Sequence, residues 1–225
     1  MRLLRGSRNP NTLVGIFLLV LLAIFAGPGM IPNLLPSLIP GADESILCQW
    51  LRTGDDRAEH QSLIGRAAEN PLNIRVRTTA LPQQTGQTLK VTIVISNESI
   101  GTIAIYYNPD QVRIGDDGAS SGLGMVFNSP NPQPRGAGGG GAIPEEDIRL
   151  LGPRQSCVHH EEWSYEQIPQ LGLSLGQNIV KAYYRSTSAG STSLTNTAQQ
   201  IIFGDQGLWV GVIESESIPI PIGTS

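Results

Sequence analysis

The sequence predicts a mainly β domain, an antiparallel β-sandwich, attached to a membrane by one N-terminal transmembrane helix. Two observations predict this architecture: an uncharged apolar segment near the N-terminus, and an apolar/polar alternation with a period of two in the later part of the chain. Composition agrees, because 15% charged residues with 26 glycines and 16 prolines in 225 residues disfavour a helical bundle. The net charge of −4 provides no basic footprint, so we expect no nucleic-acid partner.

The segment 12–31 predicts the transmembrane helix. No charged side chain occurs between Arg8 and Asp43, and about 20 apolar residues are enough to cross a bilayer. The alternative is a cleaved signal peptide ending at Ala26, although Ile24 stands where such a cleavage site prefers a small residue. The apolar side chains of the expected span include Leu13, Ile16, Phe17, Leu21, Ile24 and Phe25.

Charges around this segment predict its orientation. Arg2, Arg5 and Arg8 lie in residues 1–11, whereas the first acidic residue is Asp43. By the positive-inside rule the N-terminus is cytoplasmic. We therefore expect a single-pass protein of the bacterial cytoplasmic membrane whose C-terminal domain is periplasmic or extracellular.

Residues 32–70 predict a Pro-rich and helical juxtamembrane segment. Prolines recur every four residues from Pro28 to Pro40, which excludes a continuous helix and favours broken turns at the membrane surface or against a partner. A stiff apolar linker is the alternative. Two short helices should follow, at 43–54 and 55–69. Their apolar faces are expected to contain Ile46, Leu47, Trp50 and Leu51 in the first and Leu63, Ile64 and Ala67 in the second.

Residues 71–225 predict the extracytoplasmic β-sandwich. Apolar and polar side chains alternate in 72–77 and 89–96, as in strands with one buried face. The Pro/Gly-rich stretch 128–147 and the Ser/Thr-rich stretch 186–199 are expected to be loops. Trp50, Trp163 and Trp209 lie in periodic segments and are expected in the core. Further strands are expected at 103–107, 112–114, 125–127 as a short edge strand, 148–151, 156–163, 178–185, 201–203 and 208–213.

The two cysteines, Cys48 and Cys157, predict a disulfide, because the expected topology places both outside the cytoplasm. This bond would clamp the juxtamembrane segment onto the strand that contains Cys157. The alternative is a metal site made of Cys157, His159, His160 and Glu161 or Glu162. Strand alternation sends His160 and Glu162 to the opposite face from the other three, so at most three ligands could converge.

Catalytic motifs are not found in the sequence. The only histidines are His60, His159 and His160, and no serine stands in a Gly-x-Ser-x-Gly nucleophile elbow. We therefore expect no enzymatic activity and no cofactor.

Three motifs resemble the immunoglobulin-like domains of the BsuPI proteinase-inhibitor type. They are LKVTIVISNES from Leu89, LLGPRQSCVHHEEW from Leu150, and LSLGQNIVKAYY from Leu173, and the resemblance covers about residues 72–215. It implies an immunoglobulin-like antiparallel β-sandwich. Ile179 departs from the pattern, because a corner tyrosine would be expected there. The resemblance implies no inhibitor activity here, since no residue matches a reactive segment.

An anchored β domain without a chemical site predicts an accessory subunit of a membrane-protein complex. The expected partners are the lipid bilayer and integral membrane subunits, possible hosts being photosynthetic or respiratory electron-transfer assemblies with a soluble electron carrier docking nearby. The alternative is a free-standing, membrane-anchored surface module whose loops bind a protein, peptide or sugar.

Overall fold

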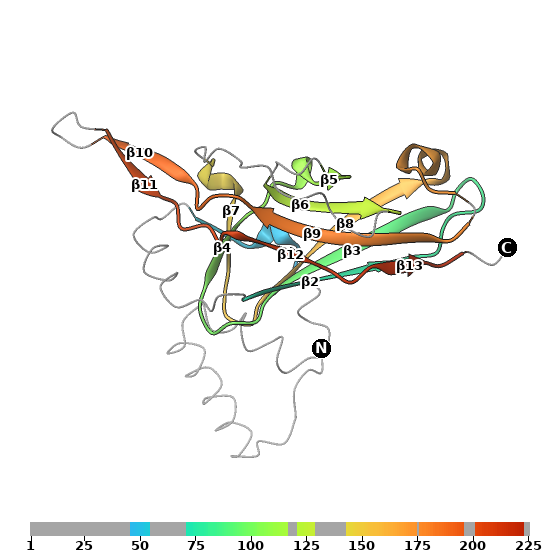
Figure 1. Ribbon diagram of the computed structural model, residues 1–225, viewed down its shortest axis with the longest axis horizontal. Helices are drawn as coiled ribbons and strands as arrows, with labels where there is room; N and C mark the ends of the chain where they lie inside the picture. Colours follow the sequence, from blue (N-terminus) through green and yellow to red (C-terminus); the bar gives the residue numbers. More distant parts are fainter. Residues whose placement is uncertain are drawn as a thin grey trace, which may run out of the picture. The chain divides into compact units, whose positions relative to one another are not determined.

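The protein is described here by a computed structural model that covers residues 46–54, 71–116, 121–128, 143–174, 176–195 and 201–222. Across these ranges the chain is mainly β, with antiparallel sheets and a few short 3-10 helices (Figure 1). None of the helices in these ranges is long and apolar enough to span a bilayer. The predicted span at 12–31, its basic flank at 1–11 and the predicted helix at 55–69 lie outside the described residues.

The first sheet contains three antiparallel strands in the order β2 (Leu72–Thr78), β3 (Thr88–Asn97) and β8 (Ser156–Ser164). In β2 the side chains of Leu72, Ile74 and Val76 are buried, and the polar residues that alternate with them, at positions 73, 75 and 77, are exposed. This confirms the alternation predicted from the sequence. The strand β2 is an edge of this sheet, because it pairs only with β3.

The second sheet has the order β12 (Gly211–Glu214), β9 (Asn178–Ser186), β6 (Gly122–Phe127) and β5 (Arg113–Ile114). The short strand β13 (Ile218–Ile220) also pairs with β9, beyond the end of β12. All pairs in this sheet are antiparallel except β5 with β6. A long central strand, β9, therefore organises the sheet.

The remaining strands form smaller units. The order β1 (Arg52–Thr53), β7 (Ile148–Leu151) and β4 (Ile103–Tyr106) gives a three-stranded antiparallel sheet. The strands β10 (Ser191–Thr195) and β11 (Ile201–Asp205) form a hairpin that projects from one end of the β domain (Figure 1). The 3-10 helices are η2 (Cys48–Trp50), η3 (Pro109–Gln111), η4 (Glu145–Asp147) and η5 (Tyr165–Leu171).

One apolar core joins the first two sheets. Buried side chains from β2, β3 and β8 contact buried side chains from β6, β9 and β13, and Trp163 belongs to this cluster as predicted. Apolar burial of this kind contributes about 25 cal/mol per Å². The described residues thus contain antiparallel sheets packed around a shared core, as expected for a β-sandwich.

The prediction of a helix at 43–54 is wrong for the described residues 46–54. Only Cys48–Trp50 is helical, as a single 3-10 turn, and Arg52–Thr53 forms β1 against β7. Leu47 forms a bridge with Val158 of β8. Pairing with two sheets offers these backbone groups partners that override the helical pattern. Trp50 was expected in the core, but it is 67% exposed because the helical face that would bury it does not form.

One strand prediction and one loop prediction also need correction, and one strand was not predicted. The predicted edge strand 125–127 is β6, which starts at Gly122 and lies between β5 and β9 rather than at an edge. Part of the predicted loop 186–199 is β10, a polar strand that pairs with β11. The strand β13 was not predicted, because Ile218–Ile220 contains a proline and has only three residues. Residues 129–142 of the predicted Pro/Gly-rich loop lie outside the described ranges.

Candidate functional site

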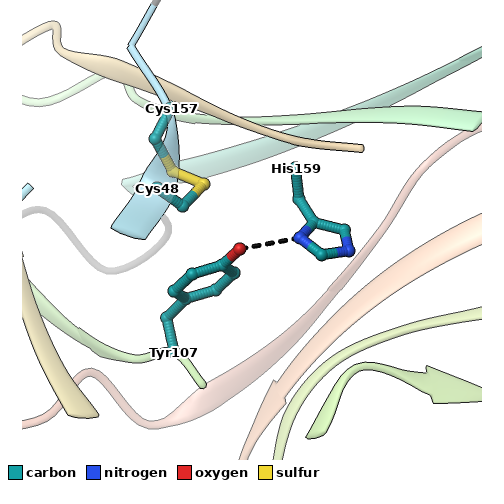
Figure 2. The surroundings of a disulfide bond; sticks show 4 residues. All are labelled: Cys48, Tyr107, Cys157 and His159. Atoms are coloured by element: carbon teal, nitrogen blue, oxygen red, sulfur yellow. Dashed lines mark hydrogen bonds between the residues drawn. A yellow bond between two sulfur atoms is a disulfide. The ribbon is translucent and has the colours of Figure 1, made fainter. Parts of the chain in front are cut away.

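A disulfide between Cys48 and Cys157 joins η2 to β8 and confirms the predicted pairing (Figure 2). Both cysteines are fully buried, and their Cα atoms are 4.7 Å apart. The Val158 N–H donates to the Ile46 carbonyl oxygen at 2.8 Å beside this bond. The chain before β1 is therefore held to β8 by a covalent bond and by backbone pairing.

A hydrogen-bonded chain of three side chains lies next to the disulfide. The Tyr107 hydroxyl is 2.7 Å from Nδ1 of His159 (Figure 2). Nε2 of His159 is 2.8 Å from Oε1 of Glu161. A neutral imidazole can accept from the tyrosine and donate to the carboxylate at the same time. Burial, followed by the Glu161 carboxylate, raises the pKa of Tyr107 to about 12. The three groups therefore satisfy one another's hydrogen-bonding capacity.

These side chains line a cavity of about 310 Å³, which we call the β8 cavity. Its other walls come from the segment before β1, from the start of η3 and from β8 itself. In this cavity the Glu161 carboxylate can accept hydrogen bonds, and the exposed His160 ring adds further polar surface. The lining residues are Leu47, Gln49, Tyr107, Pro109, Val158, His159, His160 and Glu161.

The alternative of a metal site at 157–162 is contradicted by this geometry. Cys157 is in the disulfide, and His160 lies on the other face of β8, where its Nδ1 is 3.0 Å from the Thr92 hydroxyl. Glu162 pairs with Lys90 at 3.1 Å. Partial burial and the Lys90 ammonium both lower the pKa of His160. In the described part of the chain, no three His, Cys, Asp or Glu side chains are grouped to hold a metal ion.

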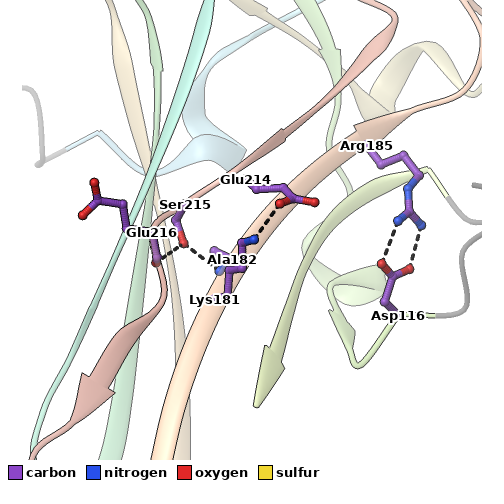
Figure 3. Close-up of polar contacts among 7 residues, drawn as sticks. All are labelled: Asp116, Lys181, Ala182, Arg185, Glu214, Ser215 and Glu216. Carbon is purple, nitrogen blue, oxygen red and sulfur yellow. Dashed lines mark hydrogen bonds and ion pairs between the residues drawn. The ribbon is translucent and has the colours of Figure 1, made fainter. Parts of the chain in front are cut away.

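A second hollow, of about 440 Å³, lies between β2 and the β12–β13 segment, and we call it the β2 groove. One wall contains residues 73–77 of β2. The other is made of Glu214, Ser215, Glu216 and Ile218. Ser215 anchors this second wall to β9, because its N–H donates to the Ala182 carbonyl at 2.8 Å and its hydroxyl accepts from the Ala182 N–H at 2.9 Å (Figure 3).

Two ion pairs stabilise β9 on either side of this anchor. Lys181 Nζ contacts Glu214 Oε2 at 2.6 Å at the groove wall. Arg185 binds Asp116 through two hydrogen bonds of 2.7 Å each (Figure 3). The Arg185 guanidinium also lies 5.2 Å from the centre of the Tyr183 ring. Through these ion pairs Lys181 links β9 to β12, and Arg185 links β9 to the segment after β5.

The structure brings together only some of the residues singled out in the sequence. Cys48 and Cys157 meet as predicted, whereas the arginines at positions 2, 5 and 8 and the span residues lie outside the described ranges. Tyr107 was not predicted as a site residue, because it lies 52 positions before His159 in the chain, just after β4. The buried Arg185–Asp116 ion pair was not predicted either, although a charged residue in the largely apolar strand 178–185 was a signal for such a pair.

Comparison of the chain with protein-family models, with curated proteins and with solved structures found no match in any of the three.

Proposed function

We propose that the chain is a non-catalytic, single-pass accessory subunit of a bacterial membrane-protein complex. In this proposal residues 12–31 span the cytoplasmic membrane with the N-terminus in the cytoplasm. The β domain covers the periplasmic or extracellular side of a larger integral partner. The observation that carries the proposal is the Cys48–Cys157 disulfide, because disulfides persist mainly outside the cytoplasm.

The position of this disulfide also supports an anchoring role. Cys48 follows the predicted span and the Pro-rich segment in the chain, and Cys157 lies in the first sheet of the β domain. A covalent bond between them ties the chain that follows the predicted span directly to the β domain. Such a restraint suits a domain that must be held against a neighbour at the membrane surface.

The contacts in the β8 cavity support a non-catalytic role. Both ring nitrogens of His159 bond to other side chains of the protein and the residue is 7% exposed, so the ring is accounted for as a buried link between Tyr107 and β8. None of the described residues that line the cavity is a serine or a cysteine that could act as a nucleophile. We also propose that the subunit binds no cofactor of its own.

The proposal also includes a specific fold for the β domain. We assign residues 71–225 to an immunoglobulin-like β-sandwich, and the single core shared by two antiparallel sheets supports this assignment. A photosynthetic or respiratory electron-transfer complex is the proposed host. There the domain stabilises the assembly or offers a docking surface to a soluble electron carrier.

Extraction in a mild detergent followed by native sizing tests the proposal. A subunit should migrate with stoichiometric integral membrane proteins, and cross-linking before extraction should give the same partners. Recovery of the chain alone, at the size of one copy after cross-linking, would contradict the accessory role. That result would favour the free-standing surface module that binds a protein, peptide or sugar through its loops.

A further inference from the structure

The outer edge of β2 presents backbone groups to the β2 groove. The Glu98 N–H donates to the Pro71 carbonyl at 2.7 Å, and the Thr79 N–H donates to the Lys90 carbonyl at 2.9 Å. In an antiparallel pair the backbone groups of alternate residues point to opposite sides, so the groups of Leu72, Ile74 and Val76 point away from β3. Among the described residues, no backbone hydrogen bond reaches these outward groups.

The two walls of the groove differ in chemistry. Arg75 is exposed on the outer face of β2, and Arg77 lies on the same face two residues further along. The opposite wall contains Ile218, which is partly buried, and Glu216, which is exposed. An acidic side chain is therefore favoured on the arginine face and disfavoured on the Glu216 face.

We propose that the β2 groove binds an extended acidic peptide segment of a partner, which adds a strand to the outer edge of β2. Strand addition supplies main-chain hydrogen bonds, and alternate side chains supply specificity. The added strand places acidic residues on the Arg75 face and small apolar residues toward Ile218. Binding at the β2 groove does not require the partner to be a membrane-protein complex.

Charge argues against a second copy of this chain as the occupant. An antiparallel two-fold pairing of β2 with itself, centred on the strand, sets Arg75 opposite Arg75 of the second copy and Asn73 opposite Arg77. Like charges directly across a ladder are destabilising. A segment with alternating carboxylates has the complementary pattern.

The full-length chain in detergent can be titrated with a fluorescein-labelled peptide of sequence Glu-Val-Glu-Val-Glu-Val-Glu. Saturable binding is expected, and a peptide of the same composition with its glutamates and valines in separate blocks should bind at least about fivefold more weakly, since block order breaks the alternation. Two further peptides carry N-methyl groups either on the valines or on the glutamates. One of these two should lose binding, because only one set of N–H groups faces β2 in a given strand direction.

The variant Arg75→Glu should weaken binding of the alternating peptide by at least about fivefold. Arg154→Glu makes the same change of charge on an exposed turn outside the groove and should bind as the wild type does. Absence of saturable binding of the alternating peptide would overturn the proposal. So would a block peptide that binds as tightly as the alternating peptide, or two methylated peptides that both bind as tightly as the unmethylated one. An Arg75→Glu variant that binds the alternating peptide as tightly as the wild type would overturn it as well. Because these titrations use a synthetic peptide, their failure is distinct from a failure to find the chain in a complex.

Discussion

At the scale of single residues, the Arg185–Asp116 pair predicts a large and non-additive effect on stability. The two side chains are 1% and 2% exposed, so removal of either one takes a directly bonded counterion away from a buried charge. Asp116→Ala is expected to lower the free energy of unfolding by about 3–5 kcal/mol. The double variant Asp116→Ala with Arg185→Met should recover part of this loss, because it removes both charges.

Denaturant unfolding of the wild type, the two single variants and the double variant completes this thermodynamic cycle. Additive losses in the double variant would show that the pair is not coupled, contrary to its geometry. Lys181→Met is a useful comparison on the same strand, because its partner Glu214 is exposed and can be solvated after the change. Its cost should be smaller than that of Asp116→Ala.

Tyr107 predicts a dependence of stability on alkaline pH. Its pKa rises from 10.0 to about 12 in the folded protein, so the unfolded chain loses this proton first as pH increases. The contribution of Tyr107 is fully present below pH 10 and is lost as pH rises to about 12, and it amounts to roughly 2–3 kcal/mol.

The variant Tyr107→Phe isolates this contribution, because burial also raises the pKa of Tyr184 and Tyr106 and both remain in the variant. Denaturant unfolding between pH 9 and pH 12 should show a shallower loss of stability with pH in the variant than in the wild type. Phenolate absorbance should show one fewer group titrating near pH 12. Identical slopes for the two proteins would contradict the assignment.

At the scale of elements, the disulfide between η2 and β8 predicts a stabilisation that does not depend on packing. It joins residues separated by 109 positions, and restriction of the unfolded chain over such a loop corresponds to about 4–5 kcal/mol in the chain-entropy account. Cys48→Ser with Cys157→Ser should lose a comparable amount in denaturant unfolding. Dithiothreitol should destabilise the wild type only after unfolding exposes the buried bond, and it should leave the double variant unchanged.

A strand could be predicted from the sequence most directly where one of its faces is buried and the other is exposed, because apolar and polar residues then alternate. The alternation in β2 predicted its strand and its buried face. The strand predicted at 148–151 has the bounds of β7, although all four of its residues are buried. The same reasoning failed for Cys48–Trp50, because long-range pairing with β7 and β8 outweighs a local helical pattern. It failed for β10 as well, since a polar strand in a hairpin has no apolar alternation to detect.

The candidate sites were predictable only where a covalent rule applies. Two cysteines have one possible intramolecular pairing, and the export expected from the sequence favours their oxidation, so the Cys48–Cys157 bond could be predicted. The contact between Tyr107 and His159 joins elements 52 positions apart, and no local pattern encodes that distance. The outward edge of β2 also required the strand order, which sequence periodicity does not give.

At the scale of the whole molecule, the architecture predicts that membrane attachment and folding can be separated. Residues 43–225 form a compact unit, and both the disulfide and the shared core lie within it. A chain that starts at Asp43, exported behind a cleavable leader, should therefore fold, form the Cys48–Cys157 bond and remain in the soluble periplasmic fraction. The full chain should sediment with membranes and resist carbonate extraction, because residues 12–31 are expected to span the bilayer. The anchoring role would be contradicted by a full chain that carbonate releases, or by a shortened chain that still sediments with membranes.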